Sequence, residues 1–98
     1  MSDITITLDY DPIRESHLAK AKRQDDYPNS EISKWDLTES PITVTGSAKA
    51  IRWIYDYLNH LNETYQQDGE DFRANIARGA AETIWQRVGD DLPDKQRQ

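Results

Sequence analysis

The sequence predicts an α+β fold in which a small antiparallel sheet of about three strands packs against two main helices, with a short helix near the N-terminus. Three observations lead to this prediction. An N-terminal segment alternates apolar and polar residues with the period of a strand, two short β-rich segments follow it, and two long segments repeat apolar residues every three or four positions. A chain of 98 residues is expected to form a single domain over 1–98, with a frayed tail from about residue 93.

The first strand is expected at residues 4–8, where Ile4, Ile6 and Leu8 alternate with threonines. Asp11 and Pro12 follow as a helix-start signal, because Asp is a preferred N-cap residue and Pro fits the first helical turn. A short helix is therefore predicted next. Its less polar face would consist of Ile13, His17, Leu18 and Ala21.

The middle of the chain predicts a loop and then a hairpin. Residues 25–31 are polar and contain the turn formers Pro28, Asn29 and Ser30. Residues 31–37 and 41–46 have the alternation of two strands, and the short segment "TESP" joins them. The two strands are expected to pair with each other.

A long helix is predicted from about residue 48 to residue 67, after Gly46 and Ser47 interrupt the preceding strand. Its apolar stripe consists of Ile51, Ile54, Leu58, Leu61 and Tyr65. Trp53 projects roughly 100° away from that stripe. Two interpretations stay open: the N-terminal helix or the sheet covers this tryptophan, or it remains partly exposed as an aromatic anchor for a partner.

A second long helix is predicted over residues 70–88, with Glu70 and Asp71 at its positive N-terminal end. Its predicted apolar stripe consists of Phe72, Ile76, Ala80, Ile84 and Val88. Small residues at positions 74, 77, 79, 80 and 81 would let a neighbouring helix or sheet approach closely. Gly89 and Pro93 are expected to end this helix. For Trp85, as for Trp53, it stays open whether the side chain is covered by another element or remains partly exposed.

The composition predicts a cytoplasmic protein without a membrane partner. The formal net charge is −6, from 18 acidic and 12 basic residues, and there is no cysteine. No apolar run is long enough for a signal peptide or a membrane span. The negative charge argues against direct binding to nucleic acid, although residues 12–24 form a basic island.

Motifs for catalysis are missing, so we expect a protein that is not an enzyme and that binds no cofactor or metal. His17 and His60 have no second ligand at a metal-site spacing, and both are expected at the surface. Asp9 and Asp11 end a strand where magnesium-dependent enzymes often hold carboxylates. A small metal-dependent enzyme using this pair is therefore the third hypothesis, although strand-end and capping roles explain both residues.

The order of one strand and two helices, at 41–46, 48–67 and 70–88, resembles a ribbon–helix–helix repressor or antitoxin. That resemblance implies a DNA-binding regulator. The chain departs from the ribbon–helix–helix pattern in its long first helix, in the threonines that point outward from the strand, and in the sign of its net charge. A DNA-binding regulator is kept as the alternative hypothesis.

The leading hypothesis is a small acidic non-enzymatic interaction domain whose partner is a protein with a basic surface, possibly a nucleic-acid-binding complex. In size, charge and lack of motifs the chain resembles inhibitors encoded by phages and mobile elements, including anti-CRISPR and anti-restriction proteins and other DNA mimics. That resemblance is compositional. The predicted partner-binding residues are Trp53, Asp56, His60, Glu63, Asp68, Glu70 and Asp71.

Overall fold

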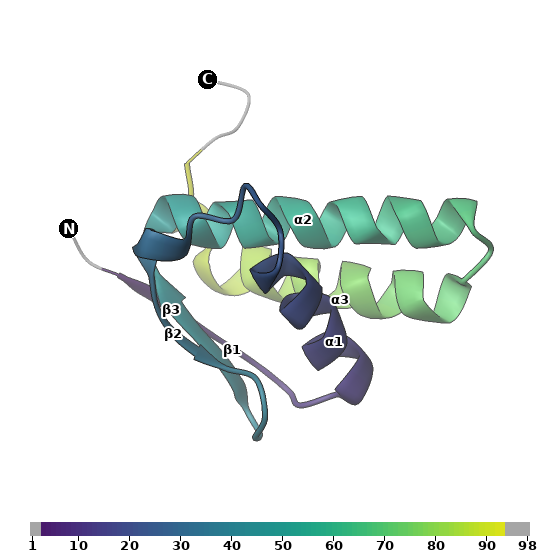
Figure 1. The fold of residues 1–98 in the computed structure, drawn as a ribbon, viewed down its shortest axis with the longest axis horizontal. Helices are drawn as coiled ribbons and strands as arrows, with labels where there is room; N and C mark the ends of the chain where they lie inside the picture. Colours follow the sequence, from purple (N-terminus) through teal and green to yellow (C-terminus); the bar gives the residue numbers. More distant parts are fainter. Residues whose placement is uncertain (1–2, 94–98) are drawn as a thin grey trace.

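The computed structural model describes residues 3–93 and confirms the predicted α+β class (Figure 1). The elements are β1 (Ile4–Leu8), α1 (Pro12–Lys22), β2 (Ile32–Asp36), β3 (Ile42–Gly46), α2 (Ala48–Gln67) and α3 (Asp71–Val88). Short 3₁₀ turns precede β2 at Asn29–Glu31 and follow α3 at Gly89–Asp91. Most of the predicted frayed tail, residues 94–98, lies outside the described residues.

The sheet has the strand order β1-β3-β2, and both pairings are antiparallel. The predicted hairpin of β2 and β3 is confirmed, and β1 pairs with the other edge of β3. The register of the hairpin shifts between Ile32 and Lys34, so Ser33 forms a bulge. At the end of β3 a side chain would not fit, because a Cβ on Gly46 would lie 2.7 Å from the carbonyl oxygen of Glu31.

The hydrophobic core lies between one face of the sheet and the paired long helices. Figure 1 shows α2 and α3 side by side, with the sheet at one end of the pair and α1 near its middle. The sheet contributes Ile6, Leu8, Ile42 and Val44 to this core. The predicted stripe of α2 is confirmed, since Ile51, Ile54, Leu58, Leu61 and Tyr65 are all buried.

The predicted stripe of α3 is wrong at its N-terminal end. Phe72 is 67% exposed, and Ile76 is only partly buried. The buried face consists instead of Ala74, Ala77, Ala80, Ala81 and Ile84. The reason is steric: a face of alanines lets the backbone of α3 approach α2, whereas a face with larger side chains would hold the two helices apart.

Helix α1 begins as predicted, because the Asp11 carboxylate accepts hydrogen bonds from the backbone amides of Ile13 and Arg14. The prediction that His17 lies at the surface is wrong: its side chain is completely buried. Its ring packs 5.2 Å from the ring of Tyr65, and its Nε2 lies 3.3 Å from the carbonyl oxygen of Arg73. His17 therefore joins α1 to both long helices.

The helix ends agree with the predicted boundaries. The Ser47 hydroxyl caps α2 by accepting a hydrogen bond from the amide of Ala50. Gly69 has a φ of 78° in the turn between α2 and α3, a conformation that favours glycine. Helix α3 stops at Val88, but Gly89 has a right-handed φ of −56°. Glycine is required there because a Cβ would lie 2.8 Å from the ring of Trp85.

Candidate partner-binding site

A groove of about 820 Å³ opens between the N-terminal half of α2 and the loop that precedes β2. Three predicted site residues, Trp53, Asp56 and His60, line it together. The remaining lining side chains come from the loop, from α2 and from the end of the described chain: Gln24, Asp26, Pro28, Glu31, Lys49, Arg52, Tyr57 and Pro93. The structure thus brings three of the seven predicted site residues to a concave surface, and the other four lie outside it.

Trp53 is partly buried against two aromatic side chains, and its role as an anchor for a partner stays a prediction. Its ring stacks on that of Tyr57 with a centroid distance of 5.4 Å and an interplanar angle of 3°. It also meets the ring of Tyr27 at 5.9 Å, while the indole Nε1 of Trp35 donates a hydrogen bond to the Tyr27 hydroxyl. Trp53 therefore belongs to a packed chain of four rings and still lines the groove.

Tyr27 is a site-supporting residue that sequence reasoning missed. It lies alone in a polar loop, so no local pattern indicated that its side chain is buried. Burial raises the pKa of Tyr27, and burial likewise raises the pKa of Tyr57. Both phenols consequently stay protonated at neutral pH, so this aromatic wall carries no charge of its own.

The charges around the groove are mixed in sign. Arg52 pairs with Asp56 at 3.2 Å and donates a second hydrogen bond to the carbonyl oxygen of Pro93. Glu31 accepts a hydrogen bond from the Ser47 hydroxyl at 2.8 Å. Lys49 adds a second positive charge to the lining. The groove itself is therefore close to neutral.

Most of the acidic character lies farther along α2. Trp53, Asp56, His60 and Glu63 are spaced by three, four and three residues, which places them on one outward face of the helix. The turn after α2 then adds Asp68, Glu70 and Asp71. We call these seven residues the acidic stripe. From Trp53 to Asp68 it runs about 22 Å along the helix axis, so the groove and the acidic turn occupy opposite ends.

The acids of the stripe differ in how far they are neutralised. Asp56 pairs with Arg52, and Glu70 lies 3.4 Å from Arg73 in a half-exposed pair. The other three acids of the stripe, Glu63, Asp68 and Asp71, form no ion pair within residues 3–93. All three of these residues are exposed. Unneutralised negative charge is therefore concentrated at the far end of α2 and at the turn.

The two alternative sites gain no support from the geometry. The Asp11 carboxylate is occupied by the helix cap, and within residues 3–93 no group of three His, Cys, Asp or Glu side chains could hold a metal ion. Strand β3 is the central strand of the sheet, with β1 and β2 on its two edges. The strand of the ribbon–helix–helix alternative therefore has no free edge.

A second aromatic cluster escaped the sequence analysis. Trp85 is 46% exposed and lies 5.2 Å from the ring of Tyr55. The Arg52 guanidinium lies 5.3 Å from the centroid of the Tyr55 ring and 5.6 Å from that of Trp85. Only the register between α2 and α3 brings these side chains together, so neither helix alone revealed the cluster.

The comparisons with known proteins provide no relative from which function could be inferred. The chain matches no protein-family model, and no curated protein or solved structure is significantly similar to it. Within residues 3–93, no helix is long and apolar enough to cross a membrane. The site's own geometry and charge are thus the basis for any functional proposal.

Burial makes His17 a source of acid sensitivity. Desolvation lowers the pKa of His17 below its usual 6.5, and the bond to the Arg73 carbonyl opposes this in part. The nearby charges of Lys20 and Arg73 lower the pKa further, against a smaller opposing effect of Asp11. Within the described residues, Nδ1 has no hydrogen-bond partner. Protonation would thus put an unpaired charge into the core.

We expect the free energy of unfolding to fall with the pH below about 6.5, because the unfolded chain binds the His17 proton more readily than the folded chain does. The stability associated with a neutral His17 is fully present above pH 6.5 and is lost as the pH falls toward the lower pKa of the folded state. The free energy of unfolding changes over this range by at most about 1.4 kcal/mol per pH unit. Urea unfolding across this range should show a flatter profile for His17→Gln. The exposed histidine provides the control, since His60→Gln should keep the wild-type slope. Equal slopes for His17→Gln and the wild type would contradict this account.

Proposed function

We propose that this protein is a small acidic non-enzymatic interaction domain that binds a basic surface of a partner protein through the acidic stripe. The observation that carries the proposal is the combination of an aromatic groove, containing Trp53, at one end of α2 with the unpaired carboxylates of Glu63, Asp68 and Asp71 toward its other end. An aromatic side chain in a concave site and charges at its periphery are the two components of many protein interfaces.

The placement of Asp68 supports a role in binding, because folding alone does not favour it. Asp68 is the C-cap residue of α2, where the helix dipole is negative and an acidic side chain is unfavourable by roughly 0.3–1 kcal/mol. Glu70 and Asp71 follow within three residues, so their charges repel that of Asp68. Glu70 and Asp71 also lie at the favourable N-terminal end of α3, so the cost falls on Asp68, whose position is consistent with a function outside the folded domain.

The magnitude of the charge limits the kind of partner. The molecule is 40 Å long and carries a net charge of −6, whereas a DNA duplex of that length carries roughly 24 phosphate charges. The domain can therefore replace only a short stretch of nucleic acid. We propose that it occupies part of the nucleic-acid-binding site of its partner, as a DNA-mimic inhibitor of the anti-CRISPR or anti-restriction type from a phage or mobile element would.

The two ends of the stripe would contribute differently to binding. Exposed carboxylates at the turn attract a lysine- or arginine-rich surface and raise the association rate. Trp53 is already held by its stack on Tyr57, so burying it against a partner requires little loss of conformational freedom and slows dissociation. The acidic turn would thus raise the association rate, and the groove would lower the dissociation rate of the complex.

The first test is capture of partners from the source cell, with identification by mass spectrometry. The wild-type domain is compared with the triple variant Asp68→Asn, Glu70→Gln, Asp71→Asn. A matched control removes the same three charges from exposed sites off the stripe, with Asp9→Asn, Asp25→Asn and Glu39→Gln. A protein retained by the wild type and the control, and lost from the triple variant, is the expected partner. Equal retention by all three proteins would contradict the proposal.

Chromatography separates this proposal from the DNA-binding alternative. The interaction domain should bind an anion exchanger and pass through a heparin column, because heparin presents sulfates in place of phosphates. A regulator that binds DNA should be retained on heparin and released by salt. Retention on heparin would favour the ribbon–helix–helix alternative over an acidic mimic.

A further inference from the structure

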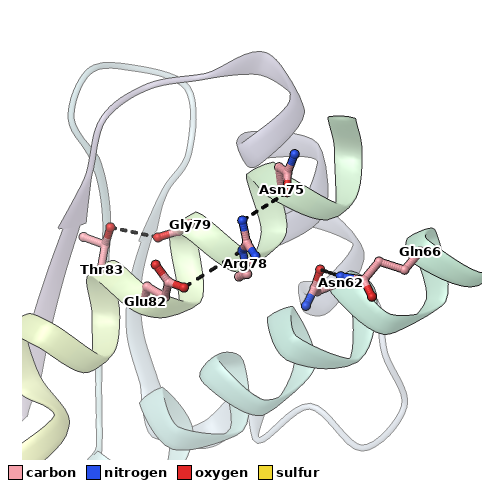
Figure 2. A network of polar contacts seen from close by, with 7 residues as sticks. All are labelled: Asn62, Gln66, Asn75, Arg78, Gly79, Glu82 and Thr83. Carbon is pink, nitrogen blue, oxygen red and sulfur yellow. Dashed lines mark hydrogen bonds and ion pairs between the residues drawn. The ribbon is translucent and has the colours of Figure 1, made fainter. Parts of the chain in front are cut away.

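The flank of the α2–α3 pair that carries Trp85 differs in character from the acidic stripe. Tyr55 and Asn62 lie two turns apart on α2, and Arg78 and Trp85 lie two turns apart on α3, so each pair shares one side of its helix. Figure 2 shows part of this surface, with Asn62 on α2 and Arg78 on α3. We define the neutral face as Arg52, Tyr55, Asn62, Arg78, Glu82 and Trp85.

The aromatic side chains of the neutral face are held in place before any contact with another molecule. Trp85 packs against the backbone of Gly89, where even a Cβ would come within 2.8 Å of the indole. Tyr55 and Arg52 contact its ring from α2, and Arg52 is itself fixed by Asp56. Nearly half of the Trp85 side chain nevertheless remains exposed. Trp, Tyr and Arg are the residues most enriched among the energetic centres of protein interfaces.

The charges of the neutral face compensate one another. Arg52 is paired with Asp56, and Arg78 lies 4.0 Å from Glu82. Asn62 accepts a hydrogen bond from Gln66, and Asn75 accepts one from Arg78, as the dashed lines in Figure 2 show. Counted with Asp56, which belongs to the acidic stripe, the two arginines of this flank are balanced by two carboxylates, on a molecule whose net charge is −6. Asp71 of the acidic stripe lies two turns before Arg78 on this side of α3, so a basic partner would be attracted to the other unpaired acids, Glu63 and Asp68, rather than to the paired charges of this face.

We propose that the neutral face is a self-association surface on which a second copy of this chain packs as a two-fold dimer. A second copy also carries a net negative charge, so it is repelled in most orientations. Two neutral faces can pack together without placing like charges opposite each other. Two-fold symmetry suits the residues present, because Arg78 of one copy can face Glu82 of the other, and the reverse pair forms at the same time. The two Trp85 side chains supply the apolar contact.

Self-association and partner binding would respond to salt in opposite directions. Two bodies of charge −6 repel each other, and salt screens that repulsion over a Debye length of about 8–10 Å at physiological strength. Dimerisation should therefore hold or strengthen as salt is raised. Binding of a basic partner to the acidic stripe should weaken. The dimer is thus testable on the isolated chain, and a failure to find any partner would not affect it.

The experiment is sedimentation equilibrium of the full chain over a wide concentration range, at low and high salt. We expect the average mass to rise toward that of two chains, at lower concentration in high salt. Trp85→Ala should raise the dissociation constant roughly 30-fold or more, the size expected of a central interface tryptophan. Phe72→Ala is the matched control, because Phe72 is the more exposed aromatic on the same helix but lies off the neutral face.

A charge variant keeps the test independent of folding effects at Trp85. Arg78 is more than half exposed, so Arg78→Glu should leave the domain folded and weaken the dimer by placing like charges opposite each other. Adding Glu82→Arg restores the balance and should restore association. A monomer at every concentration and salt would overturn the proposal. So would a dimer that Phe72→Ala abolishes while Trp85→Ala and Arg78→Glu leave it intact.

Discussion

Ile54→Ala should lower the free energy of unfolding by about 2–5 kcal/mol, the cost of removing a large aliphatic side chain from a packed core. Ile54 is fully buried on α2, in the cluster where that helix meets the sheet and α3. Truncation leaves a cavity that rigid neighbours on three sides cannot fill. Urea unfolding at neutral pH measures the change.

Phe72→Ala provides the control that distinguishes the observed core from the predicted one. The apolar spacing of α3 indicated that Phe72 is buried, but its side chain is 67% exposed. Its removal should therefore change stability by less than about 0.5 kcal/mol, as is usual at the surface. A large loss for Phe72→Ala together with a small one for Ile54→Ala would show that the helices pack through other faces.

Ala80→Leu should destabilise the domain by about 1–3 kcal/mol, because the added side-chain atoms have no space in the packed core beside α3. Ala80 is fully buried in the alanine face of α3, which sets how closely the two helices approach. A leucine at this position must push the helices apart or adopt a strained rotamer. The thermal midpoint and the urea midpoint should both fall.

The neighbouring position gives the opposite expectation. A Cβ built on Gly79 meets nothing within 4 Å, so Gly79→Ala should stabilise α3 by roughly 0.5–1 kcal/mol through its helix propensity alone. The pair thus tests the orientation of α3 with two substitutions one residue apart. Stabilisation by Ala80→Leu, or a loss of stability in Gly79→Ala, would contradict the observed rotation of the helix.

Periodicity and capping residues predicted most of the fold correctly, because these signals are local. The alternation at Ile4, Ile6 and Leu8, the cap at Asp11 and the stripe of α2 each depend on neighbours within one or two turns. The face of α3 could not be predicted in this way. Hydrophobic size favoured Phe72 and Ile76, whereas the close approach of two helices favours alanine, and only the tertiary packing decides between them.

The candidate site was predictable only in part, for the same reason. The spacing of Trp53, Asp56 and His60 places them on one side of a helix, and in the structure all three line one groove. Tyr27, which supports them, comes from a distant polar loop, whereas Arg52, which balances Asp56, lies four residues earlier on α2 itself. His17 was misjudged because its partner, the Arg73 carbonyl, is a backbone group that no sequence pattern reveals.

The central claim is that the acidic turn drives association with a basic partner, and surface plasmon resonance with the captured partner measures this most directly. Association rates are recorded at low and high salt for the wild type, the triple variant Asp68→Asn, Glu70→Gln, Asp71→Asn, and the control that neutralises Asp9, Asp25 and Glu39. Folding should be little affected, since losing an unfavourable charge at the end of α2 offsets losing favourable ones at the start of α3.

We expect the triple variant to associate more slowly than the control and with a flatter dependence on salt, while the dissociation rates of the two proteins stay similar. Trp53→Ala, measured beside them, should instead speed dissociation by a factor that corresponds to about 2 kcal/mol or more. An association rate and a salt slope in the triple variant that equal those of the wild type would contradict the proposal that the acidic stripe binds the partner.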